Sequence, residues 1–389
     1  MDKRCNIRFF DKNLNFLGEV DNFTSLIFIK NWESYGEFNI NVSNFNKELF
    51  QKQNIIMINN NPFKVGTIEQ VTVSNNNSSK ITGYTLGFWF TNRITFPPSG
   101  LEYDSYNTNV EDIMKGLVRK NLVEADDPKR NINNLIIATS LGRGEKVSFQ
   151  SRFKYVSDEL TSLSKLTGIG WGIYLDIENK KFVFDIFEGN NLSAEQNILP
   201  PKIFSSDYDN VINKSYLTSD IDYKNVAIVA GQGEGVNREI QVVNSEFSGL
   251  DRKELFVDAR DLDDNENLID RGNLKLAENQ AIETFECETI NNGYEEEWDL
   301  GDIVTVLDKK LGYIEHNRVI EVMETYEDGH ITIEPTFGVI SSSFTDKIKE
   351  ILNVPVNEVN KIIISDLEPA AAVGQIWIKD LGEVQNYGD

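Results

Sequence analysis

The sequence predicts a mainly β protein with α/β insertions. Three observations support this fold class. Apolar residues alternate with polar residues over most of the chain, which is the period of a half-buried strand. Helical periodicity is confined to four stretches, and clusters of Asn, Asp, Gly and Ser interrupt the alternation as turns do. The 389 residues, 40% of them hydrophobic, suffice for two or three domains with cores of their own.

The first hundred residues predict a series of strands. Residues 7–10 alternate and are followed by the turn residues of 11–13. Residues 37–42 alternate strictly, which predicts a strand with one face buried, and 55–58 form a short apolar run stopped by three asparagines. We therefore expect a β unit at this end of the chain.

Four stretches predict helices. The first follows Asn109, which can cap it; the second begins near Ser157 and stops at Gly168; the fourth begins near Ser343. The apolar residues of the four helical faces, in order, are Val110, Ile113, Met114, Leu117 and Val118; Leu160, Leu163 and Leu166; Leu268, Ile269, Gly272, Leu276 and Ala277; and Phe344, Ile348, Ile351 and Leu352.

A hairpin and a repeat complete the secondary structure. Residues 174–176 and 182–187 predict two strands joined by a turn at 178–180. Residues 55–82 resemble residues 303–333 in the order of strands and turns. Two readings of this similarity stay open: an internal duplication, or two ordinary β-meanders with the same period.

Four segments follow from these elements. A first β unit covers 1–100 and ends at two prolines, and a mixed α/β domain covers 101–201. A second β unit with one helix covers 202–340, and a C-terminal helix with an extended tail covers 341–389.

The composition excludes several functions. A net charge of −24 repels phosphate backbones, so we expect no specific nucleic-acid binding. The two cysteines, Cys5 and Cys287, and the two histidines, His316 and His330, are too few and too scattered for a zinc site or a disulfide framework. No apolar run is long enough for a membrane-spanning helix, and the N-terminal residues lack the apolar stretch of a signal peptide, so we expect no direct membrane insertion.

Three motifs were weighed as chemical sites. The glycine-rich segment 231–235 follows an apolar strand, but the strand-like residues after it favour a β-turn over a dinucleotide site. Acidic clusters at 258–264 and 295–299 could supply a catalytic carboxylate pair or a calcium site, yet acidic residues are so common here that a solvated face explains them. We therefore predict no catalytic residue, no metal and no cofactor.

Several short blocks follow one another in order along residues 5–340. The blocks are 32–40, 82–84 with 92–94, 225–238, 254–260, 271–278 and 300–304. Their signature residues are Gly36, Glu37, Phe38, Gly83, Arg93, Gly231, Gly233, Gly235, Arg238, Asp258, Arg260, Gly301 and Asp302. Together these blocks resemble the structural proteins of the siphovirus tail tip, the tail-hub or baseplate-hub family.

The resemblance implies an architecture and a set of partners. In that family two β-barrel-like hub domains per subunit pack in a homotrimer, which gives a pseudo-hexameric ring beneath the tail tube. It implies a structural hub in the virion tail, assembled in the bacterial host cytoplasm. The implied partners are the tail tube or distal tail protein above, tip, fibre or baseplate proteins below, and the tape-measure protein in the channel. The tail, 341–389, has no counterpart in the family.

Two other functions remain as alternatives. A tail-associated cell-wall hydrolase would depend on one of the acidic clusters. A receptor- or carbohydrate-binding tip protein would present aromatic residues on exposed loops, whereas most aromatics here lie within strand patterns.

Overall fold

The computed structural model describes residues 5–74, 78–262, 268–290 and 293–339, together with the short parallel strands β22 (Ile363–Ser365) and β23 (Trp377–Lys379). The chain divides into two units, Met1–Ser341 and Ser342–Asp389. With 44% strand and 17% helix, the predicted mainly β class is confirmed. The fourth predicted helix, from Ser343, falls outside the described residues.

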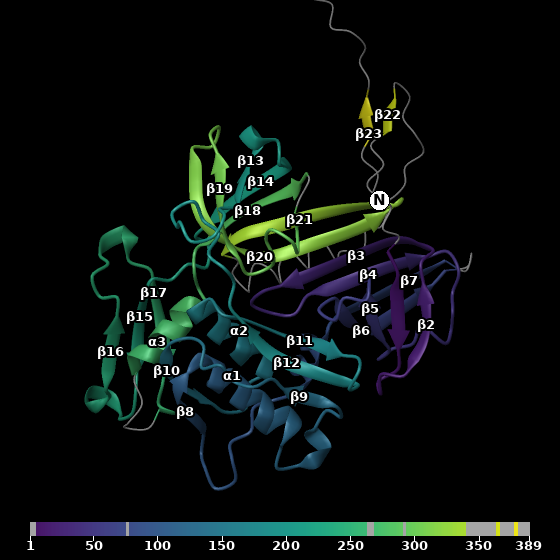
Figure 1. The fold of residues 1–389 in the computed structure, drawn as a ribbon. Helices are drawn as coiled ribbons and strands as arrows, with labels where there is room; N and C mark the ends of the chain where they lie inside the picture. The colour runs from purple at the N-terminus through teal and green to yellow at the C-terminus, as the bar shows by residue number, and fades with distance from the viewer. Residues whose placement is uncertain are drawn as a thin grey trace, which may run out of the picture. The chain divides into compact units, whose positions relative to one another are not determined.

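A sheet of 13 strands dominates the first unit (Figure 1). Its strands come from both ends of this unit: β1 (Ile7–Phe10), β2 (Phe16–Val20), β3 (Phe23–Asn31), β4 (Glu37–Val42), β5 (Ile55–Ile58), β6 (Val65–Val73), β7 (Ser79–Thr85), β13 (Ile203–Ser205), β14 (Val211–Ser219), β18 (Ile282–Thr289), β19 (Ile303–Asp308), β20 (Tyr313–Glu327) and β21 (His330–Val339). The order is β14-β18-β21-β20-β3-β4-β7-β6-β5-β1-β2, with β19 beside β20 and β13 beside β19. The two predicted β units are thus hydrogen-bonded sectors of one sheet.

The strands predicted at 37–42 and 55–58 are present, with the predicted burial of their side chains. Strand β4 buries every second residue, and all four residues of β5 are buried, as the unbroken apolar run requires. Phe28, Phe38 and Ile40 belong to the core of the N-terminal sector, while Phe204, Phe285 and Phe337 belong to that of the C-terminal sector. Each sector therefore has its own hydrophobic core.

An α/β segment lies between the two sectors in sequence. It contains β8 (Asp104–Asn109), α1 (Val110–Val118), β9 (Leu135–Ile137), β10 (Lys146–Ser151), α2 (Val156–Thr167), β11 (Gly170–Asp176) and β12 (Lys181–Phe187). Asn109 caps α1 as predicted, accepting a hydrogen bond from the Asp112 amide at 2.9 Å, and Gly168 ends α2 in the left-handed conformation. The predicted hairpin is present as β11 and β12.

Short helical turns connect these elements. The 3₁₀ turns are Leu86–Asn92, Pro128–Arg130, Ser206–Tyr208, Gly235–Asn237 and Gly249–Asp251, and a π turn, Arg119–Val123, extends α1. None of the helices in the described part of the chain is long and apolar enough to cross a membrane.

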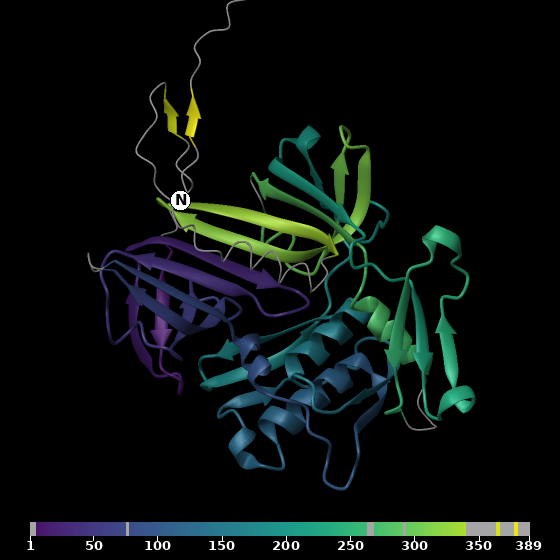
Figure 2. The ribbon, with the colours of Figure 1, turned by 180° about the vertical axis from the view of Figure 1, so that it is seen from behind.

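A small α/β module is inserted in the second sector. Its sheet has the order β16 (Ile240–Val243), β15 (Val226–Ala230), β17 (Glu254–Asp258), and α3 (Leu268–Ala277) packs on one face (Figures 1 and 2). A Cβ on Gly272 would come within 2.6 Å of the Val243 side chain, so α3 lies close against the strands. That contact fixes the rotation of the helix: Leu268 and Leu276 are buried, but Ile269 is 45% exposed, so its predicted inward position was wrong.

The glycine-rich segment 231–235 is a turn in this module. A strand, β16, follows it after the short turn Gly235–Asn237, as predicted. A dinucleotide site would need a long helix at this point, whose N-terminus binds the pyrophosphate.

Candidate functional site

The junction between the two sheet sectors is formed by β20 and β3. Residues Glu321–Glu327 of β20 pair antiparallel with Ser25–Asn31 of β3, and the Asn31 Nδ2 donates to Glu321 Oε2 at 3.0 Å. Figures 1 and 2 both show the two strands, far apart in colour, lying side by side. The first half of β20, Tyr313–Arg318, pairs with β19 instead. The long strand β20 therefore belongs to the C-terminal sector and also binds β3 of the N-terminal sector.

A buried charge cluster lies at this junction. Lys64 Nζ is 2.7 Å from Glu324 Oε2 and 3.1 Å from Glu295 Oε1, and the Lys64 and Glu324 side chains are 6% and 0% exposed. The Tyr326 hydroxyl also donates to Glu324. Burial alone lowers the pKa of Lys64, but the two carboxylates outweigh it and the net pKa is raised. The cluster joins the β5–β6 turn to β20 by buried ion pairs. Removing either partner would leave an uncompensated buried charge and destabilise the fold.

The signature residues of the N-terminal sector surround Phe38. The Phe38 side chain is 1% exposed, and Cβ atoms built on Gly66 and Gly83 would come within 2.6 Å and 2.5 Å of its ring. Gly36 precedes β4, where its amide donates to Thr85 Oγ1 at 2.8 Å, and Glu37 opens that strand opposite Tyr84. In the Gly-Glu-Phe block the Phe38 ring thus packs directly against the backbone of two glycines, where no side chain intervenes.

The signature residue Gly301 packs against Trp32, and Asp302 follows it in the chain. Gly301 has φ +92°, and a Cβ there would lie 2.1 Å from the Trp32 ring. Asp302 is 4% exposed and accepts hydrogen bonds from the amides of Asn190 at 2.7 Å and Asp299 at 2.8 Å. Burial raises the pKa of Asp302, and those hydrogen bonds only partly oppose the rise. Like the first block, this one makes packing and hydrogen-bond contacts between separate segments of the chain.

A third group closes the glycine-rich turn of the module. Arg238 donates to the carbonyls of Ala230 at 2.8 Å and Gly231 at 2.9 Å, and to Asp258 Oδ1 at 2.5 Å. Asp258 also accepts from Arg260, whose side-chain hydrogen bonds are the main cause that lowers the Asp258 pKa to about 2.

The other signature positions serve the same local purpose. Gly233 and Gly235 have φ values of +94° and +54°, which let the chain turn. Arg93 lies apart from the module and donates to the Arg130 carbonyl at 3.0 Å. The thirteen signature residues therefore do not converge on one chemical centre.

The module also presents an apolar surface. On the face of its sheet opposite α3, Phe256 and Val242 lie on either side of Ile228 and are 62% and 42% exposed. Val236 and Leu250, in the adjoining loops, are 100% and 98% exposed. Exposed apolar residues gathered on one small module are typical of a surface that another protein covers.

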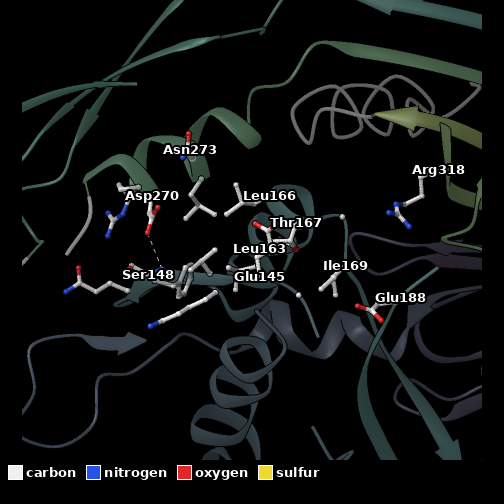
Figure 3. Close-up of a pocket in the computed structure, with 18 of the residues that line it drawn as sticks. Glu145, Ser148, Leu163, Leu166, Thr167, Ile169, Glu188, Asp270, Asn273 and Arg318 are labelled. Atoms are coloured by element: carbon white, nitrogen blue, oxygen red, sulfur yellow. Dashed lines mark hydrogen bonds between the residues drawn. The ribbon is translucent and has the colours of Figure 1, made fainter. Parts of the chain in front are cut away.

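A polar cavity of about 680 Å³ lies between the α/β segment and the module (Figure 3). Ser148 and Asp270 lie next to each other in its wall, where the Ser148 amide donates to Asp270 Oδ2 at 3.2 Å. Leu163 and Leu166 supply an apolar part of the wall, and Arg318 and Glu188 lie at the far end. At this place the donor to the Asp270 carboxylate is the Ser148 backbone amide and not its hydroxyl.

The cysteines, His316 and the acidic residues of 295–299 contact other groups of the protein. Both cysteines are buried free thiols, and burial raises the pKa of each to about 12. His316 Nδ1 lies 2.9 Å from Thr305 Oγ1 and its Nε2 lies 3.2 Å from Glu195. In the acidic segment 295–299, Glu295 pairs with Lys64 and Glu297 with Lys202 at 2.6 Å. Within the described ranges no three His, Cys, Asp or Glu residues are grouped as a metal site would require.

Sequence reasoning missed the Lys64–Glu324 pair. The two residues are 260 positions apart, so no local pattern connects them. One signal was present: Glu324 stands between Val322 and Tyr326 on the inward face of a strand, where a carboxylate needs a buried partner.

Comparison with known proteins defines the class. The prophage MuSo2 43 kDa tail protein of Shewanella oneidensis superposes with a TM-score of 0.55 at 13% identity, covering 86% of this chain and 98% of the other. The prophage tail protein gp18 of Listeria monocytogenes EGD-e gives 0.53 at 14% identity, covering 90% and 99%. A tail protein of Neisseria meningitidis MC58 gives 0.52 at 12%, covering 86% and 96%. The fold is that of phage tail proteins.

The family is shown by the sequence itself. Residues 6–339 match the family described as Siphovirus ReqiPepy6 Gp37-like protein, and the chain belongs to that family. No curated protein matches the chain in a sequence search. The predicted resemblance to siphovirus tail proteins is confirmed, and the protein is a phage tail protein.

Proposed function

We propose that this tail protein is a structural hub, which joins the tail tube to the distal tip of a phage or phage-tail-like particle. The observation that carries the proposal is the repeated strand order within the chain. The N-terminal sector pairs its strands in the order β3-β4-β7-β6-β5, and the C-terminal sector pairs its strands in the order β14-β18-β21-β20-β19. In both sectors the five strands follow one another along the sequence in the corresponding positions.

The repeat supports a ring of three chains. A six-fold tube of single-domain subunits can contact a three-fold hub evenly only if each hub subunit offers two similar surfaces. Two sectors per chain supply those surfaces, and closed symmetry lets β edges find partners within the assembly. The hub is a homotrimer in this proposal, with six β sectors around an axial channel that holds the tape-measure protein.

The charge fits passage of DNA. A trimer carries −72 formal charges, three times −24. Part of that charge faces the channel and keeps DNA from binding its wall. The hub is assembled in the host cytoplasm, contacts the tube or distal tail protein above, and binds tip, fibre or baseplate proteins below. The exposed side chains of Phe256 and Val242, on either side of Ile228, give such a protein an apolar area to cover.

The function in this proposal is assembly, without catalysis. The Asp258, Glu295 and Asp302 carboxylates are engaged by Arg260, Lys64 and backbone amides, as a joint requires. The domain division at 1–100, 101–201, 202–340 and 341–389 is retained as part of it.

Native mass spectrometry and electron microscopy of the purified chain test the proposal. We expect a trimeric mass and a ring with an axial opening. A chain that stays monomeric up to about 100 μM, or another closed stoichiometry, contradicts it. Peptidoglycan cleavage that a single carboxylate-to-amide substitution abolishes contradicts the non-enzymatic part.

A further inference from the structure

The two sectors can be aligned residue by residue through their β-bulges. Strand β3 has an extra residue between Phe23 and Ser25, and β14 has one between Ile212 and Ser215. Strand β6 has one between Ile68 and Gln70, and β20 has one between Val319 and Glu321. Bulges occupy fixed positions in a ladder. Ser25 therefore corresponds to Ser215, and Gln70 to Glu321.

Core contacts support the same alignment. In this alignment Ile68 corresponds to Val319 and Val71 corresponds to Val322, and these residues pack in the cores of their respective sectors. Ile40 and Val42 of β4 likewise correspond to Phe285 and Cys287 of β18, and all four are core residues of their sectors. The agreement between β4 and β18 does not depend on the bulges in β6 and β20, because it follows from the bulges in β3 and β14.

The alignment shows that one junction is made within the chain and another is left open. The second half of β20 binds β3. The counterpart of that half-strand is Gln70–Val73 of β6, whose edge away from β7 pairs with no strand in the described ranges. The counterpart of β3 is β14, and it pairs with β18 alone among the described strands.

We propose that the open edge Gln70–Val73 binds the open edge of β14 in a second copy of this chain, in the register of the β20–β3 junction. In that junction Glu324 lies opposite Phe28 and Met323 opposite Ile29. In the proposed junction between chains, the corresponding pairs are Val73 opposite Thr218 and Thr72 opposite Ser219. The inference rests on the proposed trimer, in which three junctions between chains alternate with three within chains.

Residues at the two open edges are more exposed than their counterparts in the β20–β3 junction, as expected if a partner strand is missing. Glu324 and Phe28 are both 0% exposed in the junction within the chain, whereas Val73 is 46% exposed and its proposed partner Thr218 is also exposed. Ile221, just beyond β14, is 80% exposed.

The edge also lacks the usual protection. Residues 70–73 contain no charge and no proline, the devices that normally keep a strand edge from pairing. The β14 lysine, Lys214, is held by Asp308.

Disulfide trapping tests the register. Directly opposed residues in an antiparallel pair are close enough for a disulfide, while residues displaced by two positions are about 7–8 Å apart and too far. We expect the double variant Val73→Cys with Thr218→Cys to give covalent trimers on mild oxidation. The control, Val73→Cys with Tyr216→Cys, should give at least ten-fold less. Cys5 and Cys287 stay unreactive because both are buried.

A second variant tests the edge without cysteines. Val73→Lys places a charge on the edge and should raise the concentration for half-trimerisation at least ten-fold, with an unchanged circular dichroism spectrum. Leu141→Lys, at a residue 72% exposed in the α/β segment, adds the same charge and should leave that concentration unchanged.

The outcomes separate this inference from the proposed function. A native trimer in which Val73 and Thr218 do not crosslink overturns the register and leaves the trimeric hub standing. A native chain that stays monomeric contradicts the hub itself. Covalent trimers from the double variant, with sparse crosslinking in the control, support both.

Discussion

Single residues in this protein are constrained most where backbone meets an aromatic ring. Gly83 is the clearest case, because a Cβ there would lie 2.0 Å from the Thr67 carbonyl oxygen and 2.5 Å from the Phe38 ring. Neither the strand backbone nor a ring buried to 1% exposure can move aside easily. The signature residues thus mark joints of the fold.

We predict that Gly83→Ala destabilises the protein by about 3 kcal/mol or more, through overpacking and distortion of β6–β7. Urea unfolding followed by tryptophan fluorescence measures the change. Gly172→Ala is the matched control, since its new Cβ would meet only the Phe187 ring, at 3.4 Å. Equal stability of the two variants would show that the Phe38 contact relaxes without cost.

At the scale of elements, helix packing joins the module to the α/β segment. Glu159 of α2 is half-buried and faces α3, which contains Arg271 and Lys275; Glu278 directly follows that helix, and Lys154 is close by on the segment of Glu159. Burial raises the pKa of Glu159 to about 7, and the neighbouring cations only partly oppose the rise. The interface between α2 and α3 therefore contains a carboxyl group that ionises near neutral pH.

A pH-dependent stability follows from this carboxyl group. Between its ordinary value of 4.5 and about 7, the folded state keeps the proton that the unfolded state has lost. Glu159 therefore makes stability fall as pH rises through that window. We predict that Glu159→Gln removes this fall and raises the melting temperature at pH 8 by about 2 °C or more.

Thermal unfolding at pH 5, 6, 7 and 8 measures the effect. Glu178→Gln, in the exposed turn between β11 and β12, is the control and should follow the wild-type curve. A Glu159→Gln curve parallel to the wild-type curve would mean that the carboxyl is ionised in the folded protein throughout the range.

Local patterns predicted elements well and long-range pairing poorly. The alternation in 37–42, the cap at Asn109 and the stop at Gly168 depend on neighbours in sequence, and each was found where expected. The similarity of 55–82 to 303–333 predicted two meanders that the sheet contains. The rotation of α3 was missed at Ile269, because Gly272 sets it through contact with strands some thirty to forty residues away.

The sheet junction could not be predicted from local patterns. Nothing near β3 in the sequence indicates that its partner is the second half of β20, and the Lys64–Glu324 pair depends on that same pairing. The net charge predicted that nucleic acid is no specific partner, but it did not show which carboxylates are neutralised by neighbours. Those assignments required the three-dimensional structure.

At the scale of the whole molecule, charge opposes the proposed ring of three chains. Each chain has a net charge of −24, so subunits of a ring repel one another. Screening by salt weakens that repulsion much more than it weakens hydrogen bonds between strands or apolar contacts.

We predict that trimerisation becomes tighter as salt increases. Raising sodium chloride from 20 to 300 mM should lower the concentration for half-trimerisation about ten-fold, as measured by analytical ultracentrifugation. Val73→Lys should show a smaller gain, because its junction is impaired at every salt concentration. A trimer that dissociates as salt rises would show that ion pairs between subunits, rather than strand edges, hold it together.

The β20–β3 junction has a consequence for biosynthesis. Asn31 and Glu321 hydrogen-bond across the junction but are 290 residues apart, so at about 5–20 residues per second a ribosome needs about 15–60 s to make the second after the first. During that interval the N-terminal sector can fold, yet the edge of β3 has no partner within its own chain. Nascent chains on one polysome are then exposed to mispairing with each other, and the yield of soluble protein depends on how fast translation reaches β20.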